Sequence, residues 1–437
     1  MILIDRQRCA RCGGCIDVCP EGALTLAEAR LLVSRVCTDC GNCLSACPMG
    51  ALRLTGEAAP APTPLRRRYD LIVVGAGPGG STAAETAARA GLSVLLLEKR
   101  QEIGSPVRCA EGVGHEALTL FLAPDPRWIA AEVTRAEITA SAGGTTRTLR
   151  ADGGRGYILE RRLFDRALAE RAAAAGAEVR VKAAVTGLLS EGRRVCGVRV
   201  RRNDLGEGPR EIEVEAQVVI AADGVEGQLG RWAGLTEALP LKDTMVCVQY
   251  LLAGIEIDPA CTCYLIDPGL APGGYAWIFP KGEGRANVGL GVQADLWRDV
   301  PGSRTVLGLL DRFIEERPFL ARGYPVTLIA GNVPVALPPE RLVADGFMLV
   351  GDAARQVDPL TGGGITNAMA AGRLAAQTAA EAIAAGDTSA ARLARYVEAW
   401  HRERGRKMER NYRLRERFAP PTRTDERFLQ AFALAVG

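Results

Sequence analysis

Eight of the thirteen cysteines lie within the first fifty residues, in two copies of one spacing pattern. Each copy reads C-x2-C-x2-C-x3-C-P, and the two copies consist of Cys9, Cys12, Cys15 and Cys19, and of Cys37, Cys40, Cys43 and Cys47. Four thiolates can surround an iron–sulfur cube, and the short spacers let three consecutive cysteines wrap one corner. Zinc is the alternative, because C-x2-C pairs also form zinc sites. Two full runs of this spacing favour iron–sulfur chemistry and therefore the transfer of single electrons.

These runs resemble those of bacterial two-cluster ferredoxins, in which the fourth cysteine of each run binds the cluster of the other run. The resemblance implies two 4Fe-4S clusters, one on Cys9, Cys12, Cys15 and Cys47 and the other on Cys37, Cys40, Cys43 and Cys19. It predicts a small N-terminal α+β ferredoxin-like domain over residues 1–56. An Ala/Pro-rich stretch at 57–68 has the composition of an extended interdomain linker.

A glycine-rich turn follows this stretch, between an apolar strand and a helix. In the G-x-G-x-x-G pattern, Gly75 allows a tight turn, Gly77 lets a pyrophosphate approach the backbone, and Gly80 lets the helix pack closely on the strand. The start of the helix offers amide groups and a dipole to the phosphates. Glu98 ends the next strand at the spacing expected for a carboxylate that binds a ribose. The pattern predicts a Rossmann-like nucleotide site but does not distinguish NAD from FAD.

Two later segments favour FAD. One apolar strand ends at Asp223, and another ends at Gly351 and Asp352. Together with the glycine-rich turn, they resemble the three FAD-contact segments of the family that includes p-hydroxybenzoate hydroxylase. The resemblance implies that Asp352 binds a ribityl hydroxyl, that Arg161 lies near the phosphates, and that a later loop meets the isoalloxazine. The implied loop contacts are Pro359, Gly362, Gly363 and Gly364. For Asp223, an ordinary strand-end turn remains an alternative.

The aromatic residues Tyr275, Trp277 and Phe279 alternate along an apolar strand and therefore point to one face of a sheet. Three large rings on one face suit a long apolar ligand, although a core strand would show the same pattern. The surrounding segment is similar to the Y-x-W-x-F-P segment of geranylgeranyl reductases. We therefore expect these three side chains to bind substrate.

A stretch containing Arg108, Cys109 and Glu111 resembles the Cys-(Ala/Gly)-Glu-Gly segment of the same family. The resemblance covers residues 69–400, and its members use FAD to saturate carbon–carbon double bonds of isoprenoid chains. It implies that Cys109 is a proton donor or polar contact beside the flavin, and that Arg108 and Glu111 position a headgroup or the flavin. From residue type alone, a buried free cysteine is more often inert packing, and the two charged residues equally suit a structural ion pair.

Composition sets limits on class and compartment. A chain of 437 residues with 48% apolar residues suits two or three domains, and a net charge of +3 gives no indication of a nucleic-acid partner. Iron–sulfur ligands together with scattered free cysteines indicate a reducing cytoplasm. No signal-peptide pattern and no run of 18 apolar residues occur in the sequence. The arginine-rich stretch 401–427 fits a solvated helix face or peripheral contact with the inner face of the membrane.

We therefore expect mixed α/β and α+β architecture. A discontinuous Rossmann-like FAD domain and an antiparallel-sheet substrate domain should occupy 69–385, the substrate part mainly at 236–335, with a helical C-terminal region at 386–437. No second dinucleotide fingerprint occurs, so electrons should come from a low-potential donor through the clusters to FAD, which would reduce a geranylgeranyl lipid or diphosphate. Two rivals remain: a protein that passes electrons to a membrane quinone, and an aromatic hydroxylase that needs oxygen and NADPH.

Overall fold

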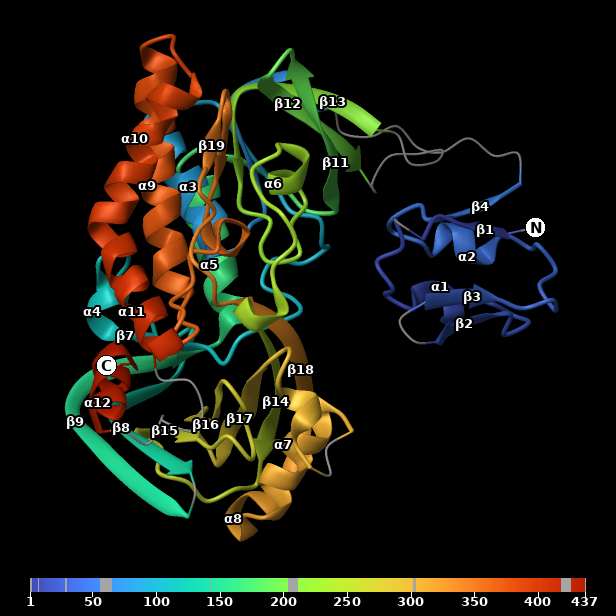
Figure 1. Cartoon of the computed structure of the whole chain (residues 1–437). Coiled ribbons are helices and arrows are strands. Elements are labelled where there is room, and N and C mark those ends of the chain that lie inside the picture. Colours follow the sequence, from blue (N-terminus) through green and yellow to red (C-terminus); the bar gives the residue numbers. More distant parts are fainter. Residues whose placement is uncertain are drawn as a thin grey trace.

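The structure is a computed structural model (Figure 1). It describes residues 2–6, 8–27, 30–55, 65–142, 144–202, 211–301, 304–417 and 426–436. Most of the expected linker at 57–68 lies outside these residues. Within the described ranges, no helix combines the length and the apolar character that crossing a membrane requires.

The N-terminal unit is a pair of two-stranded sheets with two short helices. Its elements are β1 (Ile2–Ile4), α1 (Gly14–Asp17), β2 (Leu24–Ala27), β3 (Arg30–Val33), α2 (Asn42–Ser45) and β4 (Leu52–Leu54). β1 pairs with β4 and β2 pairs with β3, both antiparallel, so each sheet joins one strand from each half of the repeat. Leu24, Leu52, Cys15 and Cys43 are buried between the halves. This is the ferredoxin-like α+β unit that the cysteine repeat predicts.

The first large sheet carries the nucleotide-binding motif, and its described strands run in the order β10-β6-β5-β13-β12-β11, with β20 beside β13 and β19 beside β20. The strands are β5 (Arg68–Val74), β6 (Val94–Leu97), β10 (Glu178–Arg180), β11 (Ala183–Glu191), β12 (Arg194–Arg202), β13 (Glu211–Ala221), β19 (Val343–Ala344) and β20 (Phe347–Leu349). β10, β6, β5, β13 and β20 pair in parallel. Their apolar runs fit strands that are covered on both faces. The packed helices include α3 (Pro78–Arg89), α5 (Arg161–Ala174), α6 (Leu229–Trp232), α9 (Ile365–Ala384) and α10 (Ala390–Trp400).

The second large sheet lies below the first in Figure 1 and has the order β18-β14-β17-β16-β15-β8-β9-β7. The strands are β7 (Gly112–Gly114), β8 (Ile129–Ala142), β9 (Thr145–Leu159), β14 (Thr244–Ala253), β15 (Cys261–Ile266), β16 (Tyr275–Pro280), β17 (Arg285–Gln293) and β18 (Tyr324–Pro334). Beside them lie α4 (His115–Thr119), α7 (Val306–Glu315) and α8 (Pro318–Ala321). The sheet is mainly antiparallel, but β8 pairs in parallel with β15. The long β8–β9 hairpin thus extends the sheet beyond the segment 236–335 to which the sequence assigned most of it.

The C-terminal region is helical, as expected. After α10, a π-helical turn (His401–Gly405) leads into α11 (Arg406–Arg417), and α12 (Glu426–Val436) follows. α12 contacts β8 and β9, and Phe428 and Phe432 of α12 are buried. On α11, Met408, Asn411 and Arg415 are buried. The basic C-terminal stretch is therefore packed along one side of its helix.

Helices α3 and α9 approach each other closely where two glycines meet. A Cβ atom on Gly372 would lie 2.0 Å from the carbonyl oxygen of Gly79. One turn earlier in α9, the Ala368 carbonyl lies 3.0 Å from the position of a Cβ on Gly79. Because α3 starts at the glycine-rich turn and α9 starts after the 359–364 loop, this contact fixes the two loops relative to each other.

We predict that Gly372→Ala destabilises the protein by about 1–3 kcal/mol, although alanine raises intrinsic helix propensity by about 1 kcal/mol. The added methyl group forces the two helices apart, so flavin retention should also fall. Chemical denaturation and flavin content measure both effects. Gln377→Ala, at an exposed position of the same helix, is the control and should stay within about 0.5 kcal/mol. A Gly372→Ala protein as stable as its parent would contradict the close contact.

Candidate active site

The glycine-rich turn has the geometry that its sequence predicts. Gly75 has φ +102°, and a Cβ there would lie 2.3 Å from the Ala222 carbonyl oxygen. A Cβ on Gly80 would lie 1.8 Å from the Gly75 carbonyl oxygen, whereas a Cβ on Gly77 would meet no atom within 4 Å. The first and last glycines therefore serve packing, and the middle one leaves open space beside the start of α3. Such space suits a pyrophosphate.

A cavity of about 680 Å³ extends from this turn along the edge of the first sheet. Glu98 lies at one end, where it accepts hydrogen bonds from the backbone N–H groups of Ala76 (3.1 Å) and Arg100 (2.9 Å). Asp223, Asp352 and Arg161 line the same cavity. The predicted nucleotide contacts are therefore gathered around one space.

The buried carboxylates of this cavity fit a polar ligand. Burial raises the pKa of Asp223, and burial raises that of Asp352 while nearby Arg161 opposes the rise. Asp223 Oδ1 is buried without a hydrogen-bond partner among the described residues. Arg161 donates to Asp165 through Nε (2.8 Å) and Nη2 (2.9 Å), which fixes its guanidinium at the cavity wall. Ribose and ribityl hydroxyls could pair with such carboxylates, so these residues fit FAD.

The loop from Pro359 to Gly364 precedes α9 and borders the cavities that strand β16 also lines. Asp358 accepts hydrogen bonds from the backbone N–H groups of Leu360 (3.0 Å) and Thr361 (3.2 Å). Asn411 of α11 donates to the same carboxylate at 2.7 Å. Gly362 has φ +72°, which favours glycine. Pro359, Gly362 and Gly364 line a second cavity, and Gly363 lines a third.

The eight N-terminal thiols gather in the two groups that the ferredoxin resemblance implies. Burial and three neighbouring thiols raise the pKa of Cys15, and these neighbours are Cys47, Cys9 and Cys12. The same causes raise the pKa of Cys43, whose neighbours are Cys37, Cys40 and Cys19. The N–H groups of Ala23 and Ala51 donate to Cys19 Sγ (3.2 Å) and Cys47 Sγ (3.1 Å). Such hydrogen bonds tune the potential of an iron–sulfur cluster.

The thiol spacing bears on the zinc alternative. Among the described residues, no group of three or more His, Cys, Asp or Glu side chains is arranged to hold one metal ion. A single zinc needs four ligand atoms around one point, whereas the thiolates of a 4Fe-4S cluster are spread around a cube. The repeated C-x2-C-x2-C-x3-C spacing of the two thiol groups is the spacing of iron–sulfur ligands.

Among the described residues, hydrogen bonds join the N-terminal unit to the nucleotide-binding part. Lys182 Nζ donates to the Arg8 carbonyl oxygen at 2.6 Å, and Gln101 Nε2 donates to the Ala10 carbonyl oxygen at 3.3 Å. Arg8 and Lys182 are 4% and 8% exposed. The acceptors flank Cys9, so the thiol group containing Cys9 is the one that borders this contact. On the other side, the Lys182 N–H donates to Arg100, which lines the nucleotide cavity.

Strand β16 (Tyr275–Pro280), called the aromatic strand below, lies beside the loop 359–364, called the flavin loop because the sequence predicts that it meets a flavin. Tyr275 and Trp277 line a cavity of about 310 Å³, and Tyr275 and Phe279 line a neighbouring cavity of about 330 Å³. The Tyr275 hydroxyl donates to the Thr361 carbonyl oxygen, which ties the strand to the loop. Phe432 of α12 packs against Tyr275 with ring centroids 5.3 Å apart. The three predicted aromatic side chains thus share one face and border open space.

Cys109 lies where these two cavities meet, and its side chain lines both. Burial raises the pKa of its thiol above the ordinary value of 9.0, while the nearby Arg161 guanidinium offsets part of the rise. Arg108 lines the cavity of about 310 Å³ and the nucleotide cavity, and it forms an ion pair with Glu226. Two of the predicted catalytic residues therefore border the shared space.

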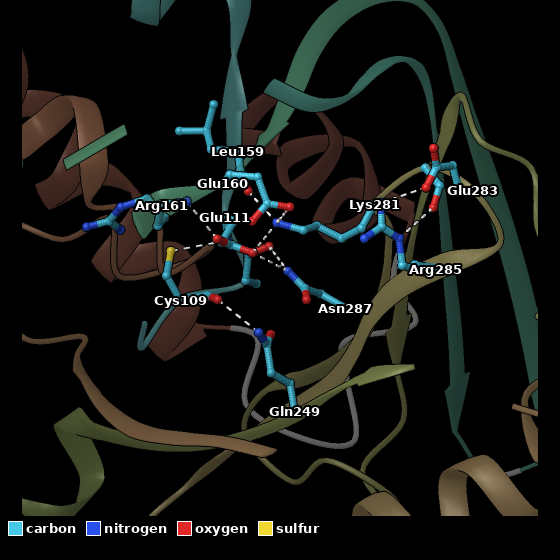
Figure 2. Close-up of polar contacts among 12 residues, drawn as sticks. Cys109, Glu111, Leu159, Glu160, Arg161, Gln249, Lys281, Glu283, Arg285 and Asn287 are labelled. Carbon is cyan, nitrogen blue, oxygen red and sulfur yellow. Dashed lines mark hydrogen bonds and ion pairs between the residues drawn. The ribbon is translucent and has the colours of Figure 1, made fainter. Parts of the chain in front are cut away.

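The third predicted catalytic residue, Glu111, borders the cavity of about 330 Å³ and forms a buried ion pair with Lys281 (Figure 2). Lys281 Nζ donates to Glu111 Oε2 at 2.8 Å and to the Leu159 carbonyl oxygen at 2.6 Å. The side chains of Lys281 and Glu111 are 3% and 5% exposed. Glu111 Oε1 accepts from the backbone N–H of Arg161 at 2.8 Å. One carboxylate thus joins the second sheet to the start of α5.

Two amide side chains complete this network. Asn287 Nδ2 donates to Glu111 Oε2 (2.8 Å) and to the Ala110 carbonyl oxygen (3.1 Å). Gln249 donates to the Cys109 carbonyl oxygen (2.9 Å) and accepts from Trp277 Nε1 (3.1 Å). The sequence reasoning missed Lys281, Asn287 and Gln249. The available signal was a single polar residue within or at the end of an otherwise apolar strand.

Comparisons with known proteins agree with this geometry. Residues 243–333 match the geranylgeranyl reductase catalytic domain, residues 70–249 match a FAD dependent oxidoreductase domain, and residues 1–48 match a 4Fe-4S dicluster domain. Among solved structures, a flavin-dependent brominase with a TM-score of 0.66 and 20% identity covers 84% of the chain and 94% of its own. At that identity the likeness shows a shared fold.

Nearer relatives carry the family name. Digeranylgeranylglycerophospholipid reductases of Methanosphaerula palustris and Methanothrix thermoacetophila are 48% and 50% identical, over 81% and 80% of this chain and 87% and 88% of their own. A solved geranylgeranyl bacteriochlorophyll reductase-like protein of Thermoplasma acidophilum is 39% identical, with a TM-score of 0.76, over 84% of this chain and 96% of its own. The chain therefore belongs to the geranylgeranyl reductase family, as a FAD-dependent oxidoreductase with an N-terminal 4Fe-4S domain.

Proposed function

We propose that the protein saturates carbon–carbon double bonds of a geranylgeranyl or related isoprenoid chain with FAD, using electrons delivered through two 4Fe-4S clusters. The observation that carries the proposal is the shared wall at Cys109, where the flavin loop, the thiol and the aromatic strand border one space. Bound FAD would supply the two-electron chemistry. Each saturation adds two electrons and two protons to one double bond, so the chain must hold an apolar substrate and provide a proton.

The cavity lining suits an isoprenoid. Besides the aromatic strand, its wall includes apolar residues from β14, β15, β18, the 359–364 loop and α12, namely Val248, Ile266, Ile329, Leu360 and Phe428. A polyprenyl chain offers almost no hydrogen-bonding group, so its binding depends on buried apolar area, worth about 25 cal/mol per Å². The names of the relatives point to geranylgeranyl groups on a glycerophospholipid.

An anaerobic assay tests this function directly. The protein, reduced by a low-potential donor and supplied with a geranylgeranyl lipid or diphosphate, should give products whose mass increases in steps of two hydrogens. Quinone-dependent reoxidation of the flavin with no saturated product would contradict the proposal and support electron transfer to a membrane quinone.

Cys109 is the candidate proton source. Because burial raises the pKa of its thiol, the proton stays on sulfur at neutral pH and is available to a substrate carbon. The hydrogen bonds from Gln249 and Asn287 to the carbonyl groups of Cys109 and Ala110 hold the thiol at the cavity wall. A positioned acid of this kind contributes about 10²–10⁴-fold to a rate.

We predict that Cys109→Ser lowers kcat by about 10²-fold with little change in KM or flavin content, because a hydroxyl is a far weaker acid. In the parent protein, kcat should stay level as pH rises to about the ordinary thiol value of 9.0 and fall above it, as the raised pKa requires. Cys247→Ser is the matched control in the same cavity; burial raises the pKa of Cys247 to about 12. A Cys109→Ser protein with parental kcat would exclude the acid role.

Lys281 and Glu111 are proposed positioning residues. Lys281→Met leaves a buried carboxylate unpaired and should lower the free energy of unfolding by about 3–5 kcal/mol. The double variant Glu111→Gln, Lys281→Met should recover part of that loss, because neither charge is then left alone. Denaturation curves measure both. Glu283→Gln, 87% exposed beside Lys281, is the control and should be neutral; equal losses in the single and double variants would contradict a coupled pair.

The cluster domain is the proposed electron entry. Removing residues 1–56 should abolish turnover with a ferredoxin-type donor while FAD remains bound, because the nucleotide contacts lie in the rest of the chain. Dithionite, which reduces flavins directly, should still support turnover and serves as the control. Flavin absorbance and product mass are the measurements. Full activity of the truncated protein with the physiological donor would contradict this route.

A further inference from the structure

We propose that the third cavity, of about 330 Å³, holds the phosphate headgroup of the isoprenoid substrate, with Arg404 and Lys407 as its ligands. The inference rests on the proposed function and adds the position and chemistry of the headgroup. This cavity and the one beside the flavin meet at Cys109 and Tyr275. A substrate whose double bond reaches Cys109 in one cavity can therefore extend its polar end into the other.

The charges of the two cavities differ in how they are balanced. Three arginines line the cavity of about 310 Å³, and each forms an ion pair with a carboxylate. The pairs are Arg108 with Glu226, Arg161 with Asp165, and Arg415 with Asp243. In the third cavity, Arg135 and Arg155 are likewise paired, with Asp258 and Glu132. The carboxylates that line it, on Glu111 and Asp358, are engaged by Lys281 and Asn411. Two further cations line the third cavity, on Arg404 and Lys407.

Arg404 and Lys407 are the cations of this cavity that donate no hydrogen bond to a carboxylate among the described residues. They lie three residues apart at the junction of the π-helical turn and α11, so they project from one side of the helix into the cavity. Glu403 lies 3.7 Å from Arg404, but both of its oxygens accept from Arg373 at 2.9 Å. Arg404 Nε is buried without a hydrogen-bond partner, and no carboxylate within 4.0 Å pairs with Lys407, among the described residues. A phosphate could accept from both side chains.

The wall of the third cavity combines two cations with apolar residues. Phosphate oxygens form short charge-assisted hydrogen bonds with guanidinium and ammonium groups. Val133, Ile158 and Phe279 line the same cavity, so its wall can also receive an apolar part of the ligand. A free inorganic phosphate would use the two cations and leave this apolar wall unfilled. A phosphorylated isoprenoid satisfies both parts.

The test compares substrates with and without the charge. Lys407→Gln and Arg404→Gln should each raise the KM for geranylgeranyl diphosphate about tenfold with kcat unchanged, and should leave the KM for geranylgeraniol unchanged. Lys407→Arg should restore affinity. Arg406→Gln removes an exposed neighbouring charge that does not line the cavity and should behave as the parent. Inorganic phosphate should compete weakly with the diphosphate and not with the alcohol.

Two outcomes would overturn the proposal. If Lys407→Gln and Arg404→Gln change the KM of both substrates equally, or of neither, the two cations do not bind the headgroup. If Arg406→Gln has the same effect as Lys407→Gln, the charge acts through general attraction of anions and not through a site. Failure of the proposed function is distinguishable, because the parent protein would then saturate neither the diphosphate nor the alcohol.

Discussion

The buried contact between the Lys281 ammonium and the Glu111 carboxylate is the interaction on which the geometry of the site depends. Either charge alone would be strongly unfavourable at 3–5% exposure, so each requires the other in place. Lys281 follows β16 in the second sheet, whereas Glu111 belongs to the segment that leads out of the nucleotide-binding part. The second oxygen of Glu111 accepts from Arg161 at the start of α5. Thus a single carboxylate sets the distance between the cofactor contacts and the aromatic strand, and it holds Cys109 between them.

Helix α11 of the C-terminal region also holds the site together, through hydrogen bonds to the flavin loop and to the second sheet. Asn411 of α11 donates to Asp358, whose carboxylate caps the N–H groups of the flavin loop, and Tyr275 donates to the carbonyl oxygen of Thr361 in that loop. Arg415 donates to Asp243 and to the Val335 carbonyl oxygen, which fastens α11 to both ends of the segment that forms most of the second sheet. Most charged residues of α11 face solvent, but the buried Asn411 and Arg415 hold the 359–364 loop and the ends of this segment, so one side of α11 forms part of the active-site wall.

What the sequence predicted correctly are features whose physical cause is local. The glycine pattern, the cysteine spacing and the alternation of Tyr275 with Trp277 and Phe279 each depend on a few neighbouring residues, so they could be interpreted without knowing the fold. The β8–β9 hairpin joins the second sheet through a parallel pairing with β15, more than a hundred residues later. The local sequence of β8 does not predict this pairing. Lys281 and Asn287 were missed for the same reason, because a single polar residue gains its role from distant partners. The roles of Arg108 and Glu111 stayed open in the sequence, and the structure separates them: Arg108 borders the nucleotide cavity and the cavity of about 310 Å³, whereas Glu111 borders the cavity of about 330 Å³ and is held in a buried ion pair with Lys281.

An enzyme that saturates an isolated double bond must also orient that bond beside its proton donor. The alkene offers no polar handle near the reacting carbons, so orientation at Cys109 must come from groups that act on other parts of the substrate. Apolar contacts alone allow a uniform polyprenyl chain to slide, because successive isoprene units present nearly the same surface. A charged group held at one end would remove that freedom by fixing which unit lies beside the thiol. Two cations that donate to no carboxylate, in a cavity that borders Cys109, would therefore serve a reductase of repeating chains. The same fixed end would determine which double bonds can be reached without release of the substrate.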